Sequence, residues 1–165
     1  MCKKERLDCH VFIPDDTLIE GDINITGDLI AGNNVTIQND ISVGGDIYFG
    51  DNADTYDIEA GGDITLGDYA NTCDIKARGD VTLRDNVKTS TIEAGGDVTL
   101  GDYADTGDIE AEGDVTLGDY ADTCDIEAEG NVTLGDDADT CDIKAGGYVH
   151  LGEDCCTGEI IHKEG

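Results

Sequence analysis

The chain has 165 residues, with 39 acidic and 9 basic side chains and a formal net charge of −30. This excess of negative charge argues against binding nucleic acid or acidic lipid through charge. No apolar run is long enough to span a membrane or resembles the hydrophobic region of a signal peptide, so we expect a single cytoplasmic domain.

The chain begins with an irregular region. Residues 1–10 predict a flexible tail with a small basic cluster, and residues 11–39 predict irregular first coils. Residues 22–39 form a degenerate repeat of 18 residues, and we expect a turn at Asn33 and Asn34 to absorb the extra residue. The basic cluster is Lys3, Lys4 and Arg6, and the expected strands of the capping coil contain Val11, Phe12, Ile13, Leu18 and Ile19.

From Asp40 onward the chain repeats every 17 residues. Regular copies fill residues 40–158, and a partial copy occupies 159–165. Apolar residues at the same offsets in successive copies are typical of a solenoid. The copies start at Asp40, Asp57, Asp74, Thr91, Asp108, Asp125 and Asp142.

Each copy predicts three short strands joined by corners. In the copy that begins at Asp108, Ile109 and Ala111 alternate with acidic residues, and Val115 and Leu117 alternate with polar ones. Alternation with a period of two indicates a half-buried β-strand. A glycine precedes the second strand in every copy, and we expect it to adopt a positive φ at a corner. These glycines are Gly45, Gly62, Gly79, Gly96, Gly113, Gly130 and Gly147.

Stacking the copies aligns their apolar residues into columns, at a spacing of about 4.8 Å. Each buried aliphatic side chain stabilises the stack by roughly 1.5–3 kcal/mol. The sequence therefore predicts an all-β, single-domain parallel β-helix with triangular coils over residues 11–165. The columns are isoleucine from Ile41 to Ile160, leucine from Leu66 to Leu151 with Phe49 at its start, and valine or isoleucine from Ile47 to Val149.

Stacking also creates columns of like charge, in which neighbouring carboxylates repel by about 1 kcal/mol in water. We interpret the columns as a solvated, solubilising face. A fixed cation site such as calcium and adaptation to a salty cytoplasm are alternatives, although GGDVTLGDY lacks the middle glycine of the nonapeptide calcium repeat. The columns include Asp46, Asp63, Asp80, Asp97, Asp114 and Asp51, Asp68, Asp85, Asp102, Asp119, Asp136.

One coil is unusually basic, with Lys76, Arg78, Arg84 and Lys88. We expect Lys76 to lie between Glu59 and Glu93 of the neighbouring coils and to relieve their repulsion. The four residues predict an electrostatic brace in the middle of the rod. A docking patch for an acidic partner or for a second filament is the alternative.

The cysteines and histidines do not predict a metal site, a cofactor site or catalysis. Cys73, Cys124 and Cys141 end their copies at one offset, and we interpret them as small corner residues because in-register side chains point in parallel. A zinc site would lack paired CxxC spacing. No nucleophile–base pair can be assembled, and no coil after Asp40 carries an insertion that would build a cleft. The candidate zinc ligands considered are Cys155, Cys156, His150 and His162.

The C-terminal end of the predicted stack exposes unpaired backbone groups and apolar side chains. An uncovered strand edge is a template for pairing with another chain, so we expect the protein to assemble with itself, end to end. The expected C-terminal interface contains Ile143, Val149, Leu151, Ile160, Ile161 and His162. The expected N-terminal interface contains Val11, Phe12, Ile13, Leu18 and Ile19.

The run TLIEGDINITGDLIAGNNVTI, followed by GGDI and GDVTL coils of 17 residues, resembles the bactofilins, which are polymer-forming cytoskeletal proteins. The resemblance covers residues 17–162. It implies a right-handed triangular β-helix that polymerises without nucleotide into scaffold filaments, often near the inner face of the cell membrane and able to recruit client proteins. A clear hydrophobic membrane-targeting segment is missing at the N-terminus, which leaves membrane association open.

Two other functions without catalysis remain as alternatives. An acidic β-helical rod could mimic DNA, although such rods have a repeat of five residues rather than 17. The outward threonines could bind ice, although the neighbouring outward column is aspartate rather than a second threonine column. The threonine column is Thr65, Thr82, Thr99, Thr116 and Thr133.

Overall fold

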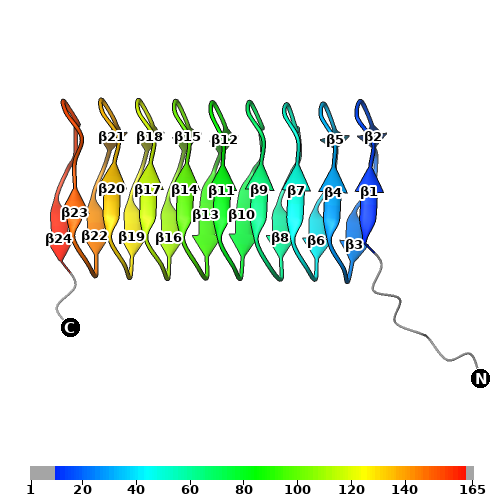
Figure 1. The fold of residues 1–165 in the computed structure, drawn as a ribbon, viewed down its shortest axis with the longest axis horizontal. Coiled ribbons are helices and arrows are strands. Elements are labelled where there is room, and N and C mark those ends of the chain that lie inside the picture. The colour runs from blue at the N-terminus through cyan, green and yellow to red at the C-terminus, as the bar shows by residue number, and fades with distance from the viewer. Residues whose placement is uncertain (1–9, 163–165) are drawn as a thin grey trace, which may run out of the picture.

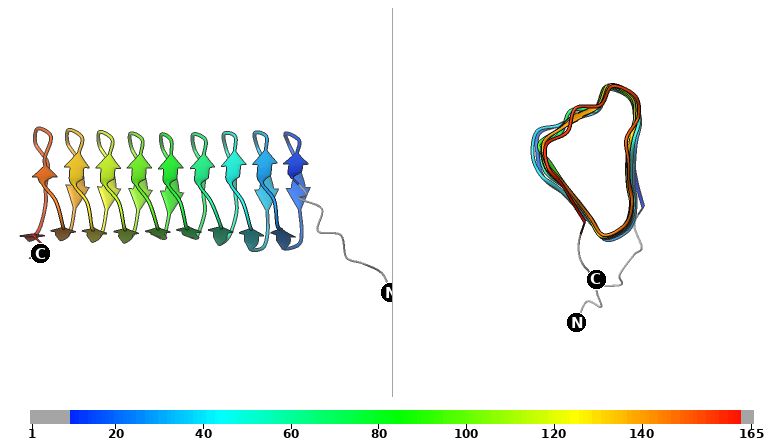
Figure 2. Two further views of the ribbon diagram at one scale, coloured as in Figure 1. Left: turned by 60° about the horizontal axis from the view of Figure 1, so that its bottom comes forward. Right: turned by 90° about the vertical axis from the view of Figure 1, so that its left-hand side faces the viewer.

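The computed structural model describes residues 10–162, which form a rod of stacked coils without a helix (Figure 1). Each coil has three sides, and the coils superimpose when the rod is viewed along its axis (Figure 2). The structure thus confirms the predicted all-β parallel solenoid. The expected flexible tail lies, apart from His10, outside the described residues.

Two sides of the rod are nine-stranded parallel sheets. The first sheet contains β1 (Val11–Ile13), β4 (Leu29–Ala31), β7 (Ile47–Phe49), β9 (Ile64–Leu66), β11 (Val81–Leu83), β14 (Val98–Leu100), β17 (Val115–Leu117), β20 (Val132–Leu134) and β23 (Val149–His150). The second sheet contains β3 (Ile23–Ile25), β6 (Ile41–Val43), β8 (Ile58–Ala60), β10 (Asp74–Ala77), β13 (Thr91–Ala94), β16 (Ile109–Ala111), β19 (Ile126–Ala128), β22 (Ile143–Ala145) and β24 (Ile160–His162).

The third side has shorter strands. These are β2 (Leu18–Ile19), β5 (Thr36–Ile37), β12 (Lys88–Thr89), β15 (Asp105–Thr106), β18 (Asp122–Thr123) and β21 (Asp139–Thr140). Isolated bridges at Asp54 and Asn71 connect β5 to β12 across the coils between them. The strands beginning at Val11 and Leu18 lie where the sequence predicts them.

The core consists of the predicted columns. Ile109 of β16 pairs in register with Ile92 on one side and Ile126 on the other, and all three are 1% exposed. The valine and leucine columns of the first sheet are buried in the same way. A column of threonines on the third side also points inward, which the apolar pattern does not reveal: Thr55, Thr72, Thr89, Thr106, Thr123 and Thr140.

The first coils are longer than the rest, but the extra residue is not in the predicted place. Leu29 pairs with Ile47, an offset of 18, whereas Ile47 pairs with Ile64, an offset of 17. Asn34 lies five residues after the start of β4, as Asn52 does after the start of β7, so this turn has the normal length. The extra residue instead falls in the corner at 38–40, between β5 and β6. The prediction that Asn33 and Asn34 absorb it was wrong.

The left-handed backbone positions also differ from those predicted. No described glycine has a positive φ. Instead, one residue of each coil adopts a φ between 54° and 60°, in the corner that precedes the third side. Asparagine and aspartate favour this region because their short polar side chains bond locally, whereas tyrosine does so rarely. The nine residues are Asp16, Asn34, Asn52, Tyr69, Asn86, Tyr103, Tyr120, Asp137 and Asp154.

Glycine recurs at one position of the repeat for a different reason, which is close packing between coils. A Cβ on Gly113 would lie 2.8 Å from both the carbonyl carbon and the oxygen of Gly96, and would overlap the carboxylate of Asp97. Contacts this short force the backbone or the carboxylate to move. Glycine is therefore required by the space that the preceding coil occupies.

We predict that Gly113→Ala lowers the free energy of unfolding by about 1–3 kcal/mol, because the added methyl group overpacks the corner. Gly21→Ala is the matched control, since a Cβ there meets nothing within 4 Å. It should change stability by less than about 0.5 kcal/mol. Urea denaturation followed by circular dichroism measures both, and equal effects of the two substitutions would contradict the close-packing explanation.

Candidate assembly interface

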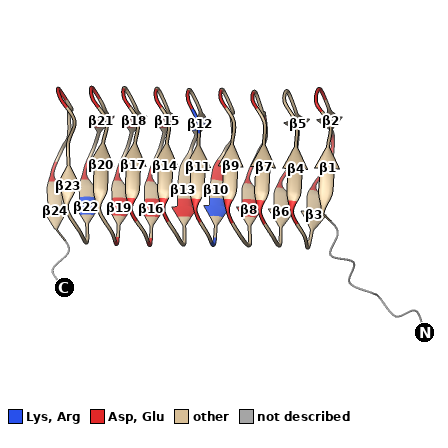
Figure 3. Cartoon of the chain, viewed as in Figure 1, with Lys and Arg blue, Asp and Glu red and all other residues tan. Residues whose placement is uncertain are grey.

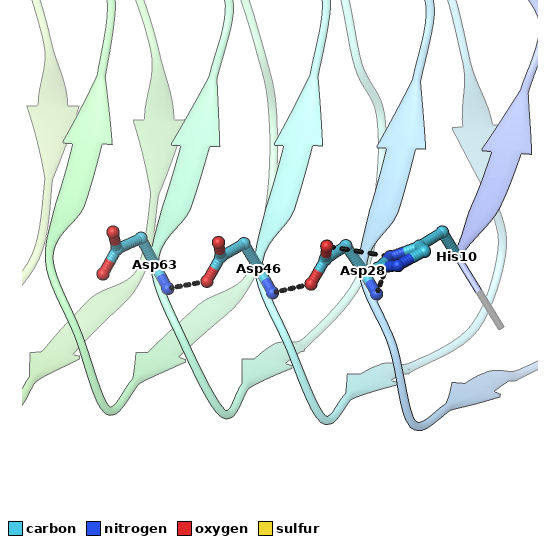
Figure 4. Close-up of polar contacts among 4 residues, drawn as sticks. All are labelled: His10, Asp28, Asp46 and Asp63. Atoms are coloured by element: carbon cyan, nitrogen blue, oxygen red, sulfur yellow. Dashed lines mark hydrogen bonds and ion pairs between the residues drawn. The ribbon is translucent and has the colours of Figure 1, made fainter. Parts of the chain in front are cut away.

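The aspartates at the corners form hydrogen-bonded ladders along the rod (Figure 4). The backbone N–H of Asp46 donates to Asp28 Oδ1, and that of Asp63 donates to Asp46 Oδ1, both at 3.0 Å. The bond repeats at the same position in successive coils. We call this series the first ladder: Asp28, Asp46, Asp63, Asp80, Asp97, Asp114 and Asn131.

A second ladder runs along the corner after the first sheet, with donor–acceptor distances of 2.8–3.3 Å. Its acceptors are Asp15, Asn33, Asp51, Asp68, Asp85, Asp102, Asp119 and Asp136. A third, less continuous series includes Asp57, Asp108, Asp125 and Asp142. The acidic columns therefore have a structural role in addition to the expected solubilising one.

His10 lies at the N-terminal start of the first ladder. Its Nδ1 is 3.3 Å from the backbone nitrogen of Asp28 and 2.9 Å from Asp28 Oδ2. The unprotonated Nδ1 accepts the amide N–H of Asp28, as an aspartate oxygen does in later coils. The protonated ring instead donates to the Asp28 carboxylate. The start of this ladder can thus be held by either form of the histidine.

The ladders account for the acidic columns without a bound cation. A hydrogen bond to a carboxylate is worth about 1.5–3 kcal/mol, which exceeds the roughly 1 kcal/mol of repulsion between neighbouring carboxylates in water. Within residues 10–162, no group of three or more His, Cys, Asp and Glu side chains is arranged to hold a metal ion.

The basic residues of the middle coil are distributed around the rod (Figure 3). Lys76 pairs in register with Glu59 and Glu93 and forms an ion pair with Glu93, which raises the pKa of its ammonium group. Lys88, on the third side, lies 2.9 Å from Asp105. Both contacts link the coil to the following one, and the position of Lys76 between Glu59 and Glu93 is the one expected from the repeat.

The two arginines lie at corners rather than beside the lysines. Arg78 follows β10, at the position that Gly61 and Gly95 fill in the neighbouring coils. Arg84 follows β11 at the position of a corner glycine. The four residues therefore do not form a single patch, although Lys76 and Arg78 line one groove on the second sheet.

At the C-terminal end, the candidate interface residues lie on the last coil, except for Ile143. Ile143 is fully buried one coil further in, beneath Ile160 of β24. Val149 and Ile160 are partly buried, and Leu151 is 37% exposed, whereas their counterparts in inner coils are almost inaccessible. The remaining two candidates, Ile161 and His162, are exposed on β24, and His162 Nδ1 lies 3.2 Å from the carbonyl oxygen of Gly147.

At the N-terminal end, the five candidates divide between the interior and the surface. Ile13 is buried, and Val11 and Ile19 are partly buried against the core. Phe12 and Leu18 point outward and are 70% and 56% exposed. The inward members lie where a further coil would cover them.

The described cysteines 73, 124, 141, 155 and 156 are free thiols. Desolvation, together with the nearby Cys124 and carboxylates, raises the pKa of Cys141. Cys155 is partly buried, with its Sγ 3.0 Å from the carbonyl oxygen of Gly135, and Cys156 is exposed. Cys73, Cys124 and Cys141 lie at corners, in agreement with their interpretation as corner residues, whereas Cys155 packs against the core.

We predict that Asp97→Ala destabilises the protein by about 1–2 kcal/mol, because the amide N–H of Asp114 loses its acceptor. Asp97→Asn should be neutral or stabilising, because Asn33 and Asn131 make the same bond in the native ladders and the change removes repulsion. Urea denaturation at low and high salt measures both. Equal destabilisation by the two substitutions would show that the charge, rather than the hydrogen bond, matters.

Comparison with known proteins identifies the family. No curated protein and no solved structure matches the chain. In the described residues, no helix is long and apolar enough to cross a membrane. Residues 49–164 match the family model described as the Flagellar Assembly Protein A β-solenoid domain, which supports the predicted β-helix family but does not single out the bactofilins. Because the match covers most of the sequence, the chain belongs to the family of the Flagellar Assembly Protein A β-solenoid domain.

Proposed function

We propose that the protein is a structural rod that assembles end to end, without nucleotide, into a scaffold filament. The observation that carries this proposal is the matching of the two ends. The first sheet runs from β1 to β23 and the second from β3 to β24, and all strand pairs are parallel. A second copy stacked head to tail would continue both sheets with the same parallel pairing.

The residues at such a junction are complementary in position. Continuing the register of each sheet brings Val149 opposite Val11, Leu151 opposite Ile13 and Ile160 opposite Ile23 of the next copy. All six side chains belong to inward columns. The junction would bury apolar area that each end leaves partly exposed, and the unpaired edge of each sheet would gain hydrogen bonds.

The net charge opposes assembly. Each copy carries a formal charge of −30, so two ends approach against long-range repulsion. Salt shortens the screening length from about 10 Å at 0.1 M to about 3 Å at 1 M. Assembly should therefore increase with salt concentration, within the range in which the rod stays folded.

The family description supports a role in building larger structures, because it names a flagellar assembly protein. The resemblance to bactofilins supports the more specific proposal of a cytoskeletal polymer in the cytoplasm. In that setting the filament surface would recruit client proteins, and its contact with the membrane would depend on those partners.

We predict that Ile160→Asp shortens or abolishes filaments without unfolding the rod, because it places a charge in the apolar junction. Ile161→Asp is the matched control: it adds the same charge to the same strand, but Ile161 lies in the outward column of the second sheet. Negative-stain microscopy across salt concentrations measures filament length, and circular dichroism checks the fold.

Short single rods of the unmodified protein under all salt conditions would contradict end-to-end assembly. Equal loss of filaments in the two variants would instead indicate that net charge, and not the inward column, controls assembly.

A further inference from the structure

Three of the left-handed corner positions carry tyrosines. We call Tyr69, Tyr103 and Tyr120 the tyrosine ridge. Their side chains are 62%, 56% and 51% exposed, and they project from the corner that precedes the third side of the rod. The ridge lies on the side of the rod and takes no part in the proposed end-to-end junction.

The tyrosines are conformationally unusual at these positions. Their φ angles are 58–60°, a region that bulky side chains rarely adopt. The six corresponding positions in the other coils are filled by asparagine or aspartate, which suit this conformation. Neither burial nor backbone geometry therefore explains the aromatic rings, and residues held in sparsely populated regions concentrate at functional sites.

The rings of the ridge are ordered by their contacts. Tyr103 and Tyr120 stack in parallel, with ring centroids 5.0 Å apart and an interplanar angle of 3°. The nearby carboxylate of Asp137, through hydrogen bonding and charge, raises the pKa of the Tyr120 phenol. The stacked pair thus presents fixed ring faces along the rod axis.

Tyr69 and Tyr103 flank one intervening coil, and we call the space between their rings the slot. These residues are two coils apart, or about 10 Å at the spacing of adjacent strands. Asn86 occupies the corner of the coil between them, and its side chain is shorter than that of tyrosine. A planar cation midway between the two rings would be about 5 Å from each, within the roughly 6 Å over which a cation is attracted to a ring face.

The surroundings of the slot are acidic on balance, although Arg84 and Lys88 lie in the same coil as Asn86 and Lys88 is paired with Asp105. Asp68, Asp85 and Asp102 of the second ladder each precede the corner residue of their own coil. One oxygen of each carboxylate accepts the amide N–H of the next coil. These three carboxylates outnumber the two cationic side chains beside the slot, so the complementary ligand is a cation. A guanidinium group is planar, weakly hydrated and able to stack on rings, which favours arginine over lysine.

We propose that the tyrosine ridge is a docking surface for an arginine-rich polypeptide segment. One arginine enters the slot over Asn86 and stacks between Tyr69 and Tyr103. Neighbouring basic residues pair with the carboxylates of the second ladder. The partner is therefore a basic protein segment that lies along the side of the rod.

The test compares two double variants that keep the net charge. Tyr69→Asn with Tyr103→Asn removes the slot, and asparagine already fills the same position at Asn34, Asn52 and Asn86. The control is Tyr48→Thr with Tyr56→Ser, which removes two exposed tyrosines elsewhere on the coil in favour of the residues found one or two coils later, Thr65 and Ser90.

Fluorescence anisotropy with a labelled oligoarginine peptide measures binding to the full chain. We expect the ridge variant to bind about 4- to 25-fold more weakly, from about two- to fivefold for each ring, and the control to change less than about twofold. Oligolysine of the same length should lose less affinity than oligoarginine. Absence of binding to the unmodified protein, or equal losses in the two variants, would overturn the proposal.

Asn86→Tyr tests the slot itself. If the number of rings determined affinity, this variant would bind the peptide more tightly. Because the added ring closes the slot, we expect weaker binding, while circular dichroism stays unchanged. Tighter binding would overturn the assignment of the slot.

Discussion

The stack depends on a hydrogen bond that passes from coil to coil at the corners. At these positions an aspartate oxygen accepts the amide N–H of the equivalent residue in the next coil, as Asp97 does for Asp114. In the first ladder this bond brings the corners so close together that the residue before the aspartate must be glycine, as at Gly113. The recurring glycine and aspartate therefore act together: the glycine allows the close approach of two coils, and the aspartate accepts the hydrogen bond between them. The large negative charge of the chain follows in part from repeating this pair in successive coils.

The fold could be predicted from the sequence because apolar columns depend only on period and alternation. The strands around Ile109 and Val115 follow directly from that pattern. The function of the corner residues could not be read in the same way. A glycine needed for a positive φ and a glycine needed for close packing look identical in a sequence, and so do an exposed aspartate and one that accepts a backbone N–H.

The errors have identifiable physical sources. Asn33 and Asn34 resemble a turn that absorbs an extra residue, but counting from Asn34 to Ile41 gives seven residues where Asn52 to Ile58 gives six. Aligning the coils on both the asparagine of the turn and the isoleucine of the next strand would therefore have placed the insertion after β5. Nothing in the sequence indicates that Tyr69, Tyr103 and Tyr120 have a positive φ, because tyrosine is rare in that conformation.

End-to-end assembly would use the ends of the rod, and the tyrosine ridge lies on its side. A solenoid keeps these two surfaces separate. Among residues 10–162, its ends are apolar cross-sections bounded by the last strands of each sheet, and its sides are repeating corners with exchangeable residues. Substitution at a corner, such as tyrosine for asparagine, leaves the core columns unchanged. A scaffold of this kind can acquire binding surfaces along its length without altering the contacts that hold it together.

The longer coils at the N-terminal end would give such a polymer an axial repeat of one molecule. A fibre made only of identical 17-residue coils would look the same at every step of about 4.8 Å along its axis. Here the enlarged corner at 38–40 and its counterpart in the first coil would recur once per molecule, roughly every 43 Å for nine coils. The fibre would thus carry enlarged corners at regular intervals. Proteins that bind these corners would be spaced at the same intervals.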